Sequence, residues 1–155
     1  MARGEPGTVG VLQWRTMIDP ENPVVRLCAE GIAAEGQGRH EDAAALYREA
    51  WAIHTDDYEA CIAAHYLARE QETLQESLKW NQLALDHALA VPDDRIAGFL
   101  PSLYLNLGWS HEVLEDPITA RACYVQGAAR LAELAPGAYT DVVRDGITRG
   151  LERTG

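Results

Sequence analysis

The chain has 155 residues, of which 47% are hydrophobic and 7% aromatic, with 13 basic and 24 acidic side chains. This length fits one domain with one buried core, and the hydrophobic fraction is typical of a globular protein, which excludes a disordered chain. The net charge of −11, which resides mainly in residues 21–94, argues against nucleic acid and anionic membrane surfaces as partners.

The first 20 residues form an N-terminal extension, predicted as a short strand at TVGVLQW or as disordered. Neither they nor any later stretch has an apolar run long enough for a signal peptide or a membrane span, so a cytoplasmic location is expected.

Helix signals follow in chain order. Asn22 and Asp116 each precede a proline, and Asp56 and Thr73 each have a glutamate three residues later, which are typical helix starts. The predicted helices span 23–35, 40–54, 57–70, 74–90, 100–114, 117–133 and 139–152. The fold class is therefore all-α.

An internal repeat runs through these helices, with 34 residues between the first and second copies and 43 between the second and third. The longer step contains a nine-residue insertion around VPDDRIAGF. Equivalent positions hold Gly31, Gly38, Ala43, Tyr47 and Ala50 in the first copy, His65, Glu72, Ser77, Asn81 and Ala84 in the second, and Gly108, Glu115, Ala120, Tyr124 and Gly127 in the third.

This pattern of small and aromatic residues resembles the tetratricopeptide repeat, and the chain is similar to small stand-alone bacterial proteins of that family with three repeats. The resemblance implies an α-solenoid of three helix-turn-helix hairpins, at about 24–57, 58–91 and 101–134, in a single domain over 21–155. The apolar line of the tail suits a C-terminal capping helix over 139–152.

In this family the first helix of each hairpin lines a concave groove, so the resemblance implies a set of groove residues. The set is Ile32, Glu35, Ile62, Tyr66, Arg69, Glu70, Leu105, Asn106, Trp109 and Glu112. Tyr66 and Trp109 are the expected anchors for a peptide, and the acids favour a basic or amphipathic partner. The alternative is that both rings pack between repeats and that Arg69 pairs with Glu70 or Glu72.

His65 departs from the pattern, because a small residue is expected there. With Arg69, Trp80 and Asn81 it predicts a polar and aromatic cluster inside the second hairpin. Two interpretations stay open: a small pocket with a titratable group, or a buried hydrogen-bond network.

No catalytic motif is present, no cofactor is expected, and the three cysteines lack the spacing of a metal site. The sequence therefore favours a non-catalytic module that binds a protein or peptide in its groove. Two alternatives stay open: a small-molecule binder or atypical enzyme using the His65 cluster, and a scaffold that forms homodimers.

Overall fold

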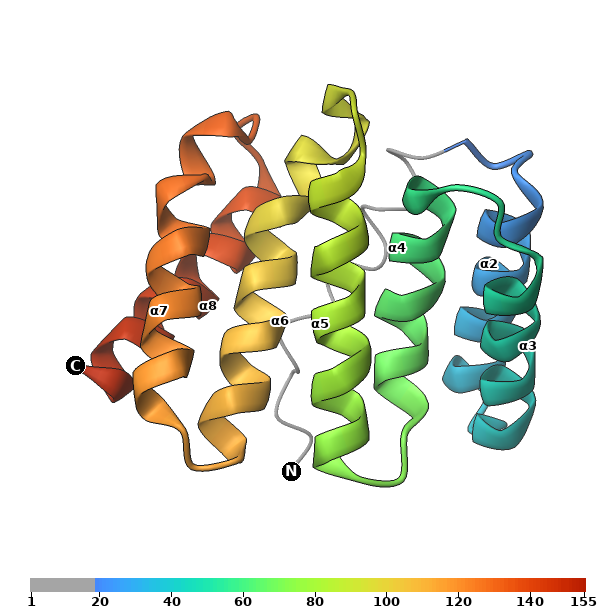
Figure 1. Ribbon diagram of the computed structural model, residues 1–155, viewed down its shortest axis with the longest axis horizontal. Helices are drawn as coiled ribbons and strands as arrows, with labels where there is room; N and C mark the ends of the chain where they lie inside the picture. Colours follow the sequence, from blue (N-terminus) through green and yellow to red (C-terminus); the bar gives the residue numbers. More distant parts are fainter. Residues whose placement is uncertain (1–18) are drawn as a thin grey trace. The chain divides into compact units, whose positions relative to one another are not determined.

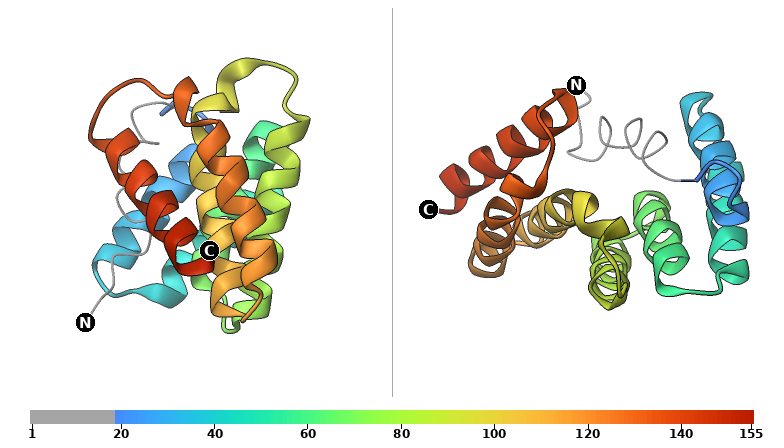
Figure 2. Two further views of the ribbon diagram at one scale, coloured as in Figure 1. Left: turned by 90° about the vertical axis from the view of Figure 1, so that its left-hand side faces the viewer. Right: turned by 90° about the horizontal axis from the view of Figure 1, so that it is seen from above.

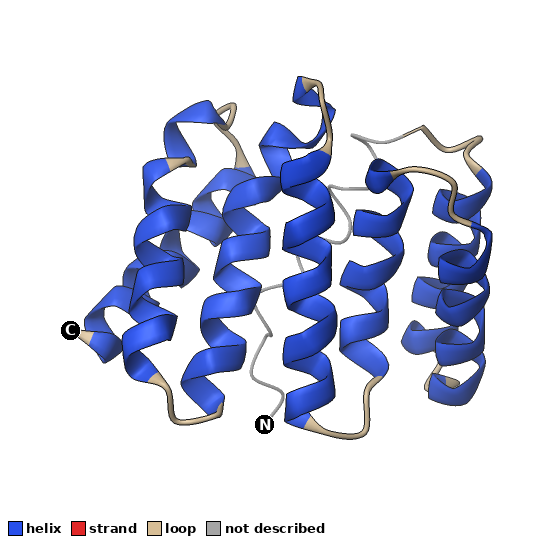
Figure 3. Ribbon diagram, viewed as in Figure 1, coloured by secondary structure: helices blue, strands red, loops and turns tan. Residues whose placement is uncertain are grey.

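The computed structural model describes residues 19–155, and these residues form seven α-helices and three short 3-10 helices without a strand (Figure 3). The all-α prediction is thereby confirmed for this part of the chain. The prediction for residues 1–20, a strand or disorder, lies almost entirely outside the described residues. The contacts group the described chain into two compact units, residues 19–93 and 94–155, named here the N-terminal and C-terminal units.

The N-terminal unit consists of two helical pairs. The first pair is α2 (Pro23–Gly36) packed on α3 (His40–Ile53), and the second is α4 (Asp57–Leu67) packed on α5 (Leu74–Ala90), with α4 also contacting both helices of the first pair (Figure 1). The short 3-10 helix η1 (Ala68–Glu70) extends α4. Side-chain oxygens of Asn22, Asp56 and Thr73 accept backbone N–H groups at the first turns of α2, α4 and α5, as predicted.

The C-terminal unit begins with η2 (Asp94–Phe99), which is formed by the predicted insertion. It continues through α6 (Leu100–Val113), α7 (Pro117–Ala129), η3 (Leu131–Glu133) and α8 (Ala138–Thr154). Helices α6 and α7 pack as a pair, and α8 runs obliquely across them (Figure 2). Pro101 lies in the first turn of α6, where a missing N–H costs nothing, so it does not kink the helix.

Two predicted helices end three and four residues earlier in the structure, and the other predicted bounds differ by at most two residues. Residues 57–70 and 117–133 were each expected as one helix, but both tighten into 3-10 turns, at Ala68–Glu70 and Leu131–Glu133. The Ser77 hydroxyl of α5 donates to the carbonyl of Ala68, the first residue of η1, at 2.8 Å. This tie fixes the end of α4 against the start of α5.

One packing arrangement occurs in both units: a glycine on the first helix of a pair faces a tyrosine ring on the second. The Tyr47 ring covers Gly31 and the Tyr124 ring covers Gly108, and a Cβ at either glycine would lie less than 3.0 Å from ring carbons. Both tyrosines are fully buried. Glycine at these positions therefore lets the ring fill the space between the two helices.

The turns that follow α2 and α6 also correspond. Gly38 has φ +77° and Glu115 has φ +63°, so both positions adopt the left-handed backbone region. Glycine enters this region freely, whereas a glutamate is strained there. The corresponding turn in the second pair is different, because η1 precedes it and Gln71 is extended.

Candidate functional site

The part of the predicted groove that the structure assembles in the N-terminal unit is centred on Glu35, near the end of α2. The Tyr47 hydroxyl donates to Glu35 Oε1 at 2.7 Å, and Arg69 Nη2 donates to Glu35 Oε2 at 2.9 Å. Arg69 reaches Glu35 because η1 ends the α4 segment beside α2 and α3. The side chains of Glu35 and Arg69 are 12% and 19% exposed, so the ion pair is accessible at its edge.

Glu70 and His40 extend this group, with His40 Nδ1 3.2 Å from Glu70 Oε1. We name the residues Glu35, Tyr47, Arg69, Glu70 and His40 the Glu35 cluster. Burial raises the pKa of Glu35, but the hydrogen bonds and charge of Arg69 and the Tyr47 hydroxyl outweigh it, so the pKa lies below its ordinary value. Burial and the neighbouring Glu35 raise the pKa of Glu70 above its ordinary value. One carboxylate is thus paired with an arginine, and the other lies beside a histidine.

The C-terminal unit contains a matching group, named here the Glu112 cluster. The Tyr124 hydroxyl donates to Glu112 Oε2 at 2.6 Å, and Arg153 at the end of α8 donates from Nη2 to the same oxygen at 3.1 Å. The guanidinium of Arg153 also lies 5.4 Å from the centroid of the Trp109 ring. The Arg153 bond and charge, opposed by burial, lower the pKa of Glu112.

Three of the predicted apolar groove residues have almost no exposed surface. Ile62, Tyr66 and Leu105 are 0%, 1% and 1% exposed. Tyr66 stacks on Tyr47 with ring centroids 5.5 Å apart, and Leu105 packs on Gly146 of α8. In this structure these side chains contribute to packing rather than to an open surface. Those that keep partial exposure are Ile32, Glu35, Arg69, Glu70, Asn106, Trp109 and Glu112.

Three of the four residues predicted as a polar pocket contact residues outside that set. His65 is 4% exposed and its ring packs edge-on against Tyr66. Arg69 pairs with Glu35, a partner that neither interpretation of the sequence included. Trp80 contacts Trp51 of α3 edge to face at 5.0 Å, and Asn81 is half-buried on α5.

Burial lowers the pKa of His65 to about 3, and the positive charge of Arg69 adds to the effect. The imidazole is therefore neutral at physiological pH, which suits a packed core position better than proton transfer near neutrality.

The sequence analysis missed a group of aromatic side chains between α3 and α5, namely Trp51, His54, Trp80 and His87. Asp57 of α4 lies beside His87. Trp51 lies 4.4 Å from the His54 ring and 5.8 Å from the His87 ring. His87 Nδ1 is 2.8 Å from Asp57 Oδ1. Two signals could have found the group: Trp51 and His54 are one helical turn apart, and Trp80 and His87 are two turns apart on one face of α5.

In the described residues, the cysteines and the other side chains that could bind a metal form no further site. Cys28, Cys61 and Cys123 are buried and unpaired, and burial raises the pKa of each thiol. Within residues 19–155 no group of three or more His, Cys, Asp or Glu side chains could hold a metal ion. None of the helices in this range has the length and apolar character needed to cross a bilayer.

Comparison with protein-family models finds no matching family, and comparisons with curated proteins and with solved structures find no significant match.

Proposed function

We propose that this chain is a non-catalytic, tetratricopeptide-like module that binds a segment of a partner protein. The repeat interpretation is supported by the Gly31–Tyr47 and Gly108–Tyr124 contacts. In the repeat register these are the small residue of the first helix and the aromatic residue of the second. A glycine at this position lets the two helices approach closely, which is the physical reason for that pattern.

The role of α8 gives a second line of support. On α4, Tyr66 stacks on Tyr47 and Arg69, three residues later, pairs with Glu35. On α8, Gly150 packs on the Tyr124 ring and Arg153, three residues later, pairs with Glu112. Helix α8 therefore contacts α6 and α7 through positions that match those of α4 against α2 and α3, as expected of a helix that closes a repeat array.

The observation that carries the binding proposal is the exposed edge of the Glu35 cluster. Glu70 has a side chain 12% exposed, its neighbour Glu35 is already neutralised by Arg69, and Ile32 is half-buried one turn earlier on α2. The unit that holds the cluster is acidic, with 15 acids against 5 bases in residues 21–94. A lysine or arginine beside an apolar side chain would pair with Glu70, whose present partner is the exposed His40, and would cover Ile32, so the partner is a basic, amphipathic segment.

Selection from a random peptide library against the whole chain tests this proposal. We expect enriched peptides that combine lysine or arginine with an apolar residue. Glu70→Lys and Ile32→Asp should each weaken binding of those peptides by about tenfold at physiological salt, because one repels the cation and the other removes the apolar contact.

Two exposed residues of α3 provide matched controls. Glu49→Lys makes the same charge change as Glu70→Lys, and Ile53→Asp the same change as Ile32→Asp, at residues outside the Glu35 cluster. Both should leave affinity within about twofold. Equal losses in Glu49→Lys and Glu70→Lys would show general charge attraction and would overturn the proposal, as would the absence of any enriched basic peptide.

A further inference from the structure

The outer face of α7 in the C-terminal unit carries an exposed apolar surface beside an open hollow. Ile118 is 84% exposed and Val125 is 49% exposed, with Ala122 between them on the same face. With Arg121 and with Thr154 of α8 these residues line a hollow of about 470 Å³. That volume lies within the ~300–1,000 Å³ range of ligand clefts. We name this surface the α7 hollow.

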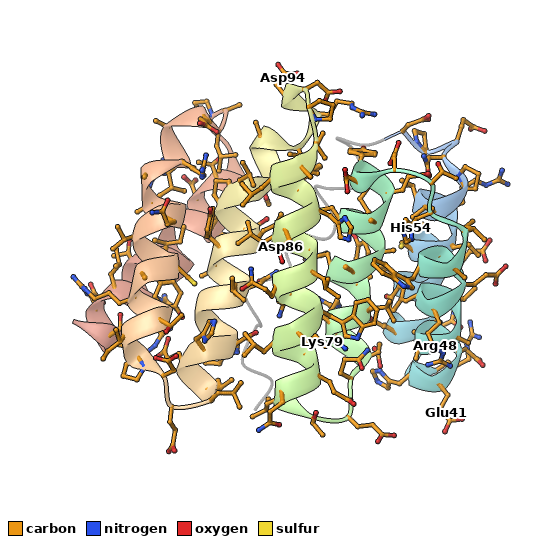
Figure 4. The ribbon with its side chains drawn as sticks, viewed as in Figure 1. Glu41, Arg48, His54, Lys79, Asp86 and Asp94 are labelled. Atoms are coloured by element: carbon orange, nitrogen blue, oxygen red, sulfur yellow. The ribbon has the colours of Figure 1, made fainter. Side chains whose placement is uncertain are left out.

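The repeat register shows that the apolar character belongs to α7 and not to the architecture. The positions of Ile118, Ala122 and Val125 correspond to Glu41, Ala45 and Arg48 on α3 and to Gln75, Lys79 and Gln82 on α5. The charged and amide side chains among these are exposed, and Figure 4 labels Glu41, Arg48 and Lys79 on their helices. Packing within a helical pair therefore does not require an apolar residue at these positions. Exposed apolar residues that cluster over a hollow mark an interaction surface.

We propose that the α7 hollow binds a short acidic, amphipathic segment of a partner protein. The apolar side chains of the segment would lie on Ile118, Ala122 and Val125. Its carboxylate would pair with Arg121, the one charged residue that lines the hollow. One Arg121 nitrogen donates to the Leu151 carbonyl at 3.0 Å, which orients the guanidinium, and arginine has five N–H donors in total. This surface is separate from the Glu35 cluster, and its charge preference is opposite.

The size of the surface favours a short segment over a second copy of the chain. A stable dimer buries roughly 800 Å² on each partner. The α7 hollow offers two large exposed apolar side chains, which cover far less, whereas a peptide of a few helical turns needs only one or two such anchors.

Fluorescence anisotropy with two defined probes tests the proposal. The first is a labelled helical peptide of about fourteen residues, or four turns, with leucines on one face and aspartate or glutamate on the other. The second has lysine in place of every acid. Both probes are tested on Glu70→Lys, because the Glu35 cluster of the unaltered chain is itself expected to bind basic segments. In that background we expect the acidic peptide to bind at least about tenfold more tightly than the basic one, and Ile118→Asp to weaken it by about tenfold.

Arg121→Glu should invert the preference, so that the basic peptide binds and the acidic one does not. Ile53→Asp, at another exposed isoleucine, and Glu70→Lys should leave the acidic peptide unaffected, which separates this surface from the Glu35 cluster. Equal binding of both probes to Glu70→Lys, or unchanged binding of the acidic probe in Ile118→Asp, would overturn the proposal. So would light scattering that gives a dimer mass for the chain and a monomer mass for Ile118→Asp, since the face would then belong to a second copy.

Discussion

The Glu35 and Glu112 clusters are two versions of one arrangement with different surroundings. In both, a glutamate one turn beyond a glycine accepts a tyrosine hydroxyl from the next helix and an arginine from the helix after that. Tyr47 lies between Gly31 and the Tyr66 ring, whereas Tyr124 lies between Gly108 and Gly150. The same polar contacts thus tolerate either a ring or a glycine on the far side of the tyrosine.

The arginines differ in exposure, which decides how much each ion pair contributes. Arg69 is 19% exposed and adjoins a second carboxyl group, whereas Arg153 is 43% exposed and lies over Trp109. Exposed pairs gain little, because water screens the charges. The tyrosine contact is therefore common to both clusters, whereas the two ion pairs differ in exposure.

The largest expected effect comes from removing the tyrosine ring. Tyr47→Ala and Tyr124→Ala should each reduce the free energy of unfolding by about 3–5 kcal/mol, because each leaves a large cavity beside a glycine. Urea unfolding followed by circular dichroism measures the loss. A loss below about 1 kcal/mol in one variant would break the equivalence of the two clusters.

The second pair of the N-terminal unit provides a pH test, because His65 occupies the register position of Gly31 and Gly108. Its folded pKa of about 3 is below the unfolded value, so the stability it contributes is present above about pH 6.5 and is lost as the pH falls. Between pH 7 and pH 5 the chain should lose about 2 kcal/mol more than His65→Leu does. Parallel unfolding curves at the two pH values decide this, and equal losses would show that the imidazole is protonated in the fold.

The next smaller effect comes from removing the arginines, and the loss of stability should differ between the two clusters. Arg69→Met should reduce the free energy of unfolding by about 1–2 kcal/mol, because it leaves Glu35 partly buried without its cation. Arg153→Met should cost less than about 0.5 kcal/mol, because the Arg153 pair is more exposed. Chemical unfolding at low and high salt measures both losses. The reverse order would contradict the exposure argument.

The turns give the smallest expected effect, with opposite signs in the two units. Glu115→Gly should stabilise the chain by about 0.5–1 kcal/mol, because it relieves a left-handed glutamate. Gly38→Ala should destabilise it by a similar amount, because φ is +77° there. Thermal unfolding of both variants is sufficient to see the difference. Destabilisation by Glu115→Gly would mean that the glutamate side chain itself holds the turn.

Much of the fold could be predicted because its signals are local. The capping residues Asn22, Asp56, Thr73 and Asp116 fix where helices begin, and all four make the expected hydrogen bonds. The glycine and tyrosine spacing also located the close helix contacts, because it repeats in the first and third copies.

The candidate site was harder to predict, because its contacts join residues far apart in sequence. In the alternative interpretation Arg69 pairs with nearby Glu70 or Glu72, whereas the structure shows it bound to Glu35, 34 residues away, since η1 follows α4 there. Tyr66 was expected as an anchor, but a helix that is buried on every face leaves no groove position exposed. The alignment of the copies showed that Glu115 stands where the first copy has Gly38, but it did not show that the backbone of Glu115 is left-handed.

Gly31 and Gly108 are required in this fold because a tyrosine ring lies against each. Urea unfolding of Gly31→Ala and Gly108→Ala, with Gly36→Ala as control, measures this requirement. A Cβ at Gly36 meets nothing within 4 Å, so the control should be neutral or gain up to about 1 kcal/mol from helix propensity. We expect losses of about 1–3 kcal/mol at both Gly31 and Gly108, in spite of that gain. Stabilisation of either variant to the level of the control would show that the glycine is not required.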